Sequence, residues 1–363
     1  MHAWRTILGR RSPARTSPGP DVPAVDDDAR TVAVIYAVWL VAFLFKHAGA
    51  AWDIAWHFRY LRDDLAPPHL LNTVGTLIAF GLLVLQSWTG RAVEIVGLRL
   101  LQAGWIIFLV SIPLDALNHR LFGLDMTTWS ATHMLLYCGT TLMLVGVLRS
   151  WYRLAPPGRG APAYALAIWV LLLDDVLFPL GQQEYGVRAV ADYLAGRTTA
   201  DPELVALAGA EVSRFAYTAI PAWVYPFWLV GMGSLLLIAA RRIQGLRWTA
   251  TAVAVGYLAL RLIAYAVFTA NGYSPSFVPV MLLGAAVVID VATQRGWRPA
   301  PTVAALLVAY YAGAALVGRF TLMPAFEAWT APLVGAFLWG VLSAWERGWL
   351  RLPQPLSMRW QAR

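Results

Sequence analysis

Cysteine and charged residues are scarce in this chain, and each scarcity excludes a class of protein. Cys138 is the only cysteine among 363 residues, so neither an internal disulfide nor a cysteine-based zinc site can form. Charged residues make up 13% of the chain, about half the share of a soluble globular domain. The basic residues are arginines apart from Lys46, and they form no stripe, which excludes a nucleic-acid-binding surface.

Long apolar runs dominate what is present, since 59% of the residues are hydrophobic. The runs are continuous and do not alternate with polar residues, which favours transmembrane helices over a barrel. The sequence therefore predicts an all-α, polytopic membrane bundle in contact with lipid. We expect about ten spans, at approximately 31–51, 69–89, 95–115, 132–151, 161–181, 216–240, 249–269, 275–293, 300–318 and 328–346.

The chain divides into tails and one transmembrane domain. Residues 1–30 are rich in Arg, Pro, Ser and Asp and lack the apolar centre of a signal peptide, so they are expected to be a disordered cytoplasmic tail. Residues 31–363 are expected to form a single transmembrane domain. Its last residues, 347–363, are expected to be a second cytoplasmic tail. The longest connection, 182–214, is expected to carry a short surface helix near 203–210.

Arginine distribution predicts the orientation in the membrane. With the N-terminus in the cytoplasm, 19 arginines fall on that side and 7 on the other, and Arg261 lies inside a span. The positive-inside rule then places both termini in the cytoplasm and the protein in the cytoplasmic (inner) membrane.

Five of the six histidines lie between positions 47 and 133, and four of them belong to a pattern that occurs twice. In the second copy the Asp comes 62 residues, and the second His 64 residues, after its counterpart. We interpret 31–151 as two parallel repeats of one helical hairpin, with 152–346 as additional helices. The two sets are Asp53, His57 and His69, and Asp115, His119 and His133.

The spacing within each set is suited to holding a metal ion. An Asp and a His four residues apart lie on one face of a helix, and the start of the next helix supplies the second His. Two imidazoles and a carboxylate leave open coordination positions, which suits copper, iron or zinc. The predicted topology places both sets near the outer face.

Local roles for these residues are the alternative to metal binding. Interfacial histidines commonly hydrogen-bond or extend toward water, and Asp53 could pair with Arg59 or Lys46, as Asp115 could with Arg120. The recurrence of the whole set at matched positions favours metal.

Haem ligation is a further alternative, in which His119 and His133 would project from one helix. Gly123 and Asp125 lie between them and argue for a helix break.

Other polar residues lie close to the two sets in the predicted topology. Lys46 shares a helix face with Asp53 and His57, so it could support the ligands from behind or form a plain ion pair. Asp174 and Asp175 are expected near the outer end of the fifth span and could also support the ligands.

Two charged residues lie within the later spans. Arg261 is in the middle of a span and requires a partner. Asp290 is expected to lie too far along the membrane normal to be that partner.

The stretch from Asp53 to His69, with Trp56 before His57 and a proline before His69, resembles the copper-binding segment of an integral-membrane subunit of the particulate methane and ammonia monooxygenases. The resemblance implies copper ligation by both sets. The second set matches a family pattern of Asn, His four residues on and His fourteen later, with Asp115 replacing Asn. The first set is one residue shorter between its histidines than in the family. The likeness covers 51–142.

The sequence thus predicts a membrane metalloprotein, copper-binding and monooxygenase-like, with no catalytic side chain identified. Such an oxidoreductase would take a hydrophobic small molecule from the bilayer and work with additional subunits. Metal or solute transport, with the two sets as an outer loading site, and a structural role without metal remain as alternatives. Transport would require polar residues that continue inward across the membrane.

Overall fold

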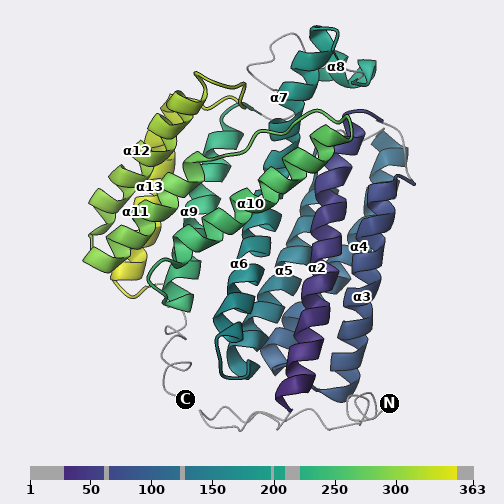
Figure 1. Cartoon of the computed structure of the whole chain (residues 1–363), viewed down its shortest axis with the longest axis vertical. Helices are drawn as coiled ribbons and strands as arrows, with labels where there is room; N and C mark the ends of the chain where they lie inside the picture. Colours follow the sequence, from purple (N-terminus) through teal and green to yellow (C-terminus); the bar gives the residue numbers. More distant parts are fainter. Residues whose placement is uncertain (1–27, 61–64, 123–126, 198–199, 209–220, 350–363) are drawn as a thin grey trace.

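The computed structural model describes residues 28–60, 65–122, 127–197, 200–208 and 221–349, and in these ranges every regular element is a helix (Figure 1). The elements in chain order are α2 (Ala29–His57), α3 (Pro67–Thr89), α4 (Ile95–Phe122), α5 (Ala131–Leu154), α6 (Gly160–Leu177), η1 (Phe178–Leu180), α7 (Gly181–Leu194), α8 (Pro202–Ala208), α9 (Val224–Gln244), α10 (Thr249–Ala270), α11 (Met281–Arg295), α12 (Pro299–Val317), η2 (Ala328–Thr330) and α13 (Ala331–Glu346). Most of the tails predicted at 1–30 and 347–363, namely 1–27 and 350–363, lies outside the described residues.

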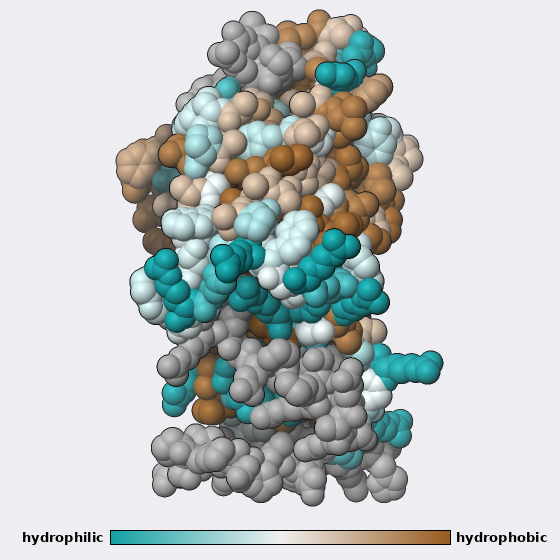
Figure 2. All heavy atoms as spheres, turned by 90° about the vertical axis from the view of Figure 1, so that its left-hand side faces the viewer, coloured by the Kyte–Doolittle hydropathy of each residue, from teal (hydrophilic) through white to brown (hydrophobic). Residues whose placement is uncertain are grey.

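Nine helical segments in the described ranges are long and apolar enough to cross a membrane, which confirms the polytopic helical bundle. Figure 2 shows a broad apolar zone on one flank with hydrophilic side chains gathered below it. The span predicted at 275–293 corresponds to α11, which has only 15 residues. At 1.5 Å per residue it measures about 22 Å, less than the roughly 30 Å of a hydrocarbon core.

The fifth span is longer than the sequence predicts. Beyond α6 the chain continues through η1 into α7, and 160–194 form one candidate span of 35 residues. The first part of the predicted connection, 182–194, therefore belongs to helix α7. Gln182, Gln183 and Glu184 are polar, but each is at most 3% exposed because α7 packs inside the bundle. The short helix expected near 203–210 is confirmed as α8.

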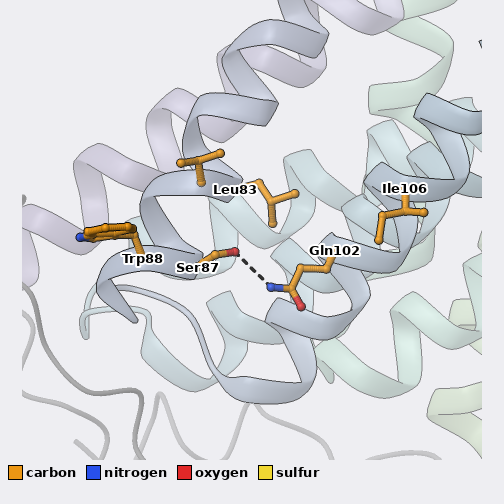
Figure 3. A pocket seen from close by; sticks show the side chains of 6 residues that line it. Leu83, Ser87, Trp88, Gln102 and Ile106 are labelled. Atoms are coloured by element: carbon orange, nitrogen blue, oxygen red, sulfur yellow. Dashed lines mark hydrogen bonds between the residues drawn. The ribbon is translucent and has the colours of Figure 1, made fainter.

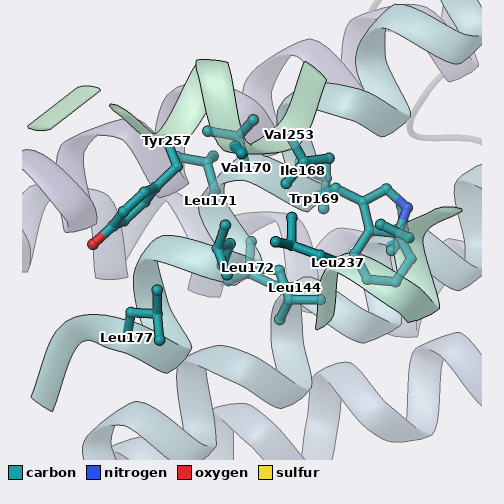
Figure 4. Close-up of a cluster of buried hydrophobic side chains, with 14 of the residues drawn as sticks. Leu144, Ile168, Trp169, Val170, Leu171, Leu172, Leu177, Leu237, Val253 and Tyr257 are labelled. Atoms are coloured by element: carbon teal, nitrogen blue, oxygen red, sulfur yellow. The ribbon is translucent and has the colours of Figure 1, made fainter. Parts of the chain in front are cut away.

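The bundle is organised around α6, whose side chains meet those of α5, α9 and α10 in one apolar cluster (Figure 4). Leu171 and Leu172 of α6 are each 2% exposed, and Leu144 of α5 and Leu237 of α9 are fully buried. This central packing holds the first hairpins against the later helices, with α10 leaning across toward the upper end of α2 (Figure 1).

The first four helices form two hairpins, α2 with α3 and α4 with α5, that pack in corresponding ways. A Cβ atom added at Gly75 would lie 2.6 Å from the carbonyl oxygen of Ala42, and one added at Gly139 would lie 2.7 Å from that of Gly104. Gly139 and Gly104 follow their counterparts by 64 and 62 residues. The close backbone approach thus recurs at the same offsets as the histidine pattern.

Candidate metal centres

Both Asp/His/His sets lie at the same end of the molecule. Helices α2 and α4 end there, and α3 and α5 begin there, at the upper end in Figure 1. Within each set, one carboxylate oxygen and one nitrogen from each histidine all lie within 4.8 Å of one another. The structure therefore brings together all six side chains that the sequence pattern singles out, in two groups of three. Those groups are Asp53, His57 and His69, and Asp115, His119 and His133.

The first set is compact. Asp53 Oδ1 lies 2.8 Å from His69 Nε2 and 3.3 Å from His57 Nε2, and the two Nε2 atoms are 3.3 Å apart. A tetrahedral ion with bonds of about 2.0–2.1 Å separates its ligand atoms by roughly 3.3–3.4 Å. An ion therefore fits between these three atoms with shifts of a few tenths of an ångström.

The second set is wider. Asp115 Oδ2 lies 3.8 Å from His119 Nε2, and Asp115 Oδ1 lies 3.5 Å from His133 Nε2. His119 Nε2 is buried and has no hydrogen-bond partner. In the first set Asp53 Oδ1 is buried too, and it makes no hydrogen bond of good geometry despite the two imidazoles beside it. Because buried polar atoms are normally hydrogen-bonded, these unsatisfied ligand atoms favour binding of a cation.

Backbone carbonyls orient one imidazole in each set. His57 Nδ1 lies 3.1 Å from the carbonyl oxygen of Tyr60, and His133 Nδ1 lies 2.6 Å from that of Thr127. Donation from Nδ1 to these carbonyls fixes the tautomer and leaves the Nε2 lone pair directed at the carboxylate. Metal-binding histidines are commonly held in this way.

The second histidine of each set is the third residue of its helix. The two helices begin in different ways. Helix α3 begins with Pro67 and Pro68, whose fixed φ angles suit the first turn, and His69 follows. Helix α5 begins at Ala131 after Ser130, whose side chain accepts the backbone N–H of His133 at 3.2 Å. Both helix starts thus present an imidazole to the end of the preceding helix.

The two carboxylates differ in their support. The Thr132 hydroxyl donates a hydrogen bond to Asp115 Oδ1 at 2.6 Å, whereas the corresponding position before His69 is Pro68, which has no hydroxyl. The second carboxylate is therefore held in place by a neighbour that the first lacks.

Replacement Thr132→Val is expected to weaken metal binding at the second set by about 10–100-fold, the usual cost of removing a hydrogen bond to a ligand. The first set keeps its affinity because it makes no contact with Thr132. Metal titration of the purified variant should resolve one weakened and one unchanged site. Thr73→Val is the matched control, because Thr73 donates only to the His69 carbonyl. Equal weakening of both sites would contradict the assignment.

Pairing with a described arginine or lysine does not account for these carboxylates. Among the described residues, neither Asp53 nor Asp115 forms an ion pair with an arginine or lysine. Arg59 donates instead to the carbonyl of Gly272 at 3.3 Å, and Lys46 donates to side chains of α3. Within the described part of the chain, the carboxylates therefore face imidazoles.

The residues expected to support the ligands lie deeper in the bundle. Lys46 Nζ donates to Asn72 Oδ1 and to Thr76 Oγ1, each at 3.1 Å. Asp175 accepts a hydrogen bond from Thr141 of α5 at 2.5 Å. These bonds join α2 to α3 and α6 to α5. They stabilise the bundle below the two sets.

Haem ligation from a single helix is wrong for this chain. His119 lies on α4 and His133 on α5, with ring centroids 6.2 Å apart. The two rings converge on Asp115 and do not project along one helix.

Sequence reasoning misses the contribution of α7, which supports both sets. Thr128 donates its backbone N–H to Gln182 Oε1 at 2.8 Å, which anchors the segment that carries the Thr127 carbonyl. The end of α2 also packs on this helix, where Ile54 and Tyr185 share a buried apolar cluster. The one signal in the sequence is the polar run at 182–184, which follows the apolar span closely, after Pro179 and Gly181.

A shallow hollow between α3 and α4 is not a candidate metal site. It encloses about 330 Å³ near the opposite end of the first hairpins, and Gln102 donates to the Ser87 hydroxyl beside it at 3.1 Å (Figure 3). Its lining offers no side chain that commonly binds a metal. The lining residues are Leu83, Val84, Ser87, Trp88, Gln102 and Ile106.

No protein-family model, curated protein or solved structure matches this chain. The described residues show a polytopic helical membrane protein with two Asp/His/His groups that could hold metal ions. What the two groups do must therefore be argued from their geometry and from the sequence motif.

Proposed function

We propose that this chain is a membrane metalloprotein that binds one copper ion at each Asp/His/His set and activates dioxygen there. The observation that carries the proposal is the twofold convergence of a carboxylate and two imidazoles at one end of the bundle. The resemblance of 51–142 to the integral-membrane segment of the particulate methane and ammonia monooxygenases supports copper as the metal.

The chemistry of the ligands also favours copper. Imidazole suits copper, iron and zinc, and among divalent first-row metals Cu²⁺ binds nitrogen and oxygen ligands most tightly. Three protein ligands leave open positions for a small molecule. Zinc and iron are the competing occupants.

The arginine distribution supports a location of the protein in the cytoplasmic (inner) membrane, with both termini in the cytoplasm. Both sets would then lie near the extracytoplasmic surface. Exposed arginines between later spans support the same orientation, because Arg247, Arg295 and Arg298 lie at the end opposite the two sets. Metal would then arrive from outside the cytoplasm.

Bound copper supplies dioxygen activation. Insertion of one oxygen atom into a C–H bond, with the other leaving as water, consumes two electrons and two protons, so a two-electron donor such as a quinol is needed. The donor would reach the site through additional subunits, and a hydrophobic substrate would enter from the bilayer. The chain's own residues hold the rings at Nδ1, and the Asp53 and Asp115 carboxylates offset the positive charge of the ion.

Elemental analysis of detergent-purified protein, combined with electron paramagnetic resonance, tests this proposal. We expect two copper ions per chain and Cu²⁺ spectra with nitrogen superhyperfine splitting. Protein that carries no stoichiometric metal, or zinc that excess copper does not displace, would overturn the proposal.

Metal transport is a second candidate, favoured by buried polar residues that continue inward from the first set. Lys46 and Asp175 are 3% and 6% exposed and lie on helices next to the first set. Copper uptake into liposomes that contain the purified protein would establish transport, whereas binding without uptake supports catalysis.

A further inference from the structure

A large cavity lies between α2, α6 and α10, apart from the metal-binding groups. It encloses about 610 Å³, within the usual range of small-molecule sites. Most of its wall is apolar, and three side chains that can carry charge face it. The lining residues are Leu44, His47, Ala48, Ala51, Trp52, Leu71, Leu171, Asp174, Leu260, Arg261, Ile263, Ala264, Val267, Phe268, Asn271 and Tyr273.

The cavity opens on the flank of the bundle. Leu44 on α2, and Ile263 and Val267 on α10, line it and are themselves 43%, 60% and 50% exposed. Both helices are membrane spans, so the opening between them faces the lipid. A ligand would therefore enter from the bilayer.

Asp174 is the acidic side chain that faces this cavity. Its carboxylate forms no hydrogen bond or ion pair with any described residue, although it is partly buried in α6. Arg261, which also lines the cavity, donates to Glu184 Oε2 at 2.7 Å and also interacts electrostatically with Asp174, so one guanidinium serves two carboxylates. The ring nitrogens of His47 lie 2.8 Å and 2.9 Å from the carbonyl oxygens of Phe43 and Leu171, and a neutral imidazole donates to only one of them.

We propose that this cavity binds an amphiphile that has an apolar body and a protonated amine head, with the ammonium group placed on Asp174. An unpaired carboxylate in an apolar wall is costly, and a cation that brings its own hydrogen-bond donors offsets that cost. The apolar side chains of α2 and α10 receive the hydrocarbon.

The charge balance separates this ligand from other lipid-like molecules. A fatty acid would add a third carboxylate beside Asp174 and Glu184, which already share Arg261, and the added negative charge is repulsive. A fatty alcohol can donate one hydrogen bond but leaves the charge uncompensated. The site is therefore selective for the amine over the acid of equal chain length.

Native mass spectrometry of the full-length protein, released from detergent with dodecylamine or dodecanoic acid added, tests the proposal. We expect one retained dodecylamine per chain and at least tenfold weaker retention of dodecanoic acid. Asp174→Asn should weaken dodecylamine retention at least tenfold. Equal retention of the amine by wild type and Asp174→Asn, or of the acid and the amine by wild type, would overturn it.

Two alanines on α10 supply a matched pair that does not alter charge. Ala264→Phe fills the cavity and is expected to abolish dodecylamine retention, whereas Ala266→Phe adds the same ring at an exposed position outside the lining and is expected to leave it unchanged. Retention by Ala264→Phe equal to that of the control would overturn the proposal. Protein from which metal has been removed should bind the amine as untreated wild type does. The copper proposal and the amine proposal can therefore fail independently of each other.

Discussion

Purified protein that carries both His57→Ala and His119→Ala is expected to contain no copper, whereas two ions are expected in the wild-type chain. Each replacement removes the imidazole that shares a helix face with the carboxylate, four residues away. One carboxylate and one imidazole remain in each set. Two such ligands bind a labile ion too weakly to survive purification, and elemental analysis measures the loss.

The single variants show whether the two sets act separately. His57→Ala and His119→Ala should each retain one ion per chain. His47→Gln is the control, because His47 bonds to backbone carbonyls of α2 and α6 and belongs to neither set. Full copper content in the double variant would refute metal binding by these residues, and loss of both ions from each single variant would refute two independent sites.

The bundle and the ligand sets could be predicted because they depend on local patterns. Continuous apolar runs define spans whatever their neighbours are. The four-residue spacing of Asp53 and His57 fixes a shared helix face, and a hairpin must return the chain to the same end. Convergence of His69 on that face then follows from short connections, which the sequence also shows.

Features that depend on packing between distant segments could not be predicted. Glu184 lies in a polar run that is typical of a connection, and only the folded chain shows it buried against α10. The backbone carbonyls that orient His57 and His133 have no side-chain signature. Asp174 is expected from the sequence to support the ligands, and the structure instead places it in the wall of the α2–α6–α10 cavity.

For Arg261, the need for a partner could be predicted from the sequence, but the identity of the partner could not. A mid-span arginine predicts a partner, and Asp290 is correctly excluded, since it bonds to Arg241 at 3.1 Å. The partner proves to be Glu184, and the two side chains are 7% and 2% exposed. No pattern within α10 identifies that residue, because it lies 77 positions earlier in the chain.

Arg261→Met is expected to destabilise the protein by about 3–5 kcal/mol, the usual cost of leaving one member of a buried ion pair without its partner. Glu184 has no second cation within ion-pairing distance among the described residues. Tyr225 donates a hydrogen bond to it at 3.4 Å, which is too long to replace a guanidinium. Denaturant-induced unfolding in detergent, followed by helical circular dichroism, measures the change in free energy.

The double variant Glu184→Met, Arg261→Met separates the cost of an unpaired charge from the value of the pair. Because the buried pair loses its hydration on folding, replacing both members by apolar side chains should recover most of the lost stability. Arg197→Met is the surface control: its pair with Asp192 is exposed on the arginine side, so its removal should cost less than about 1 kcal/mol. If the double variant is as unstable as Arg261→Met, the loss comes from the guanidinium that lies over the Tyr185 ring rather than from the charge left on Glu184.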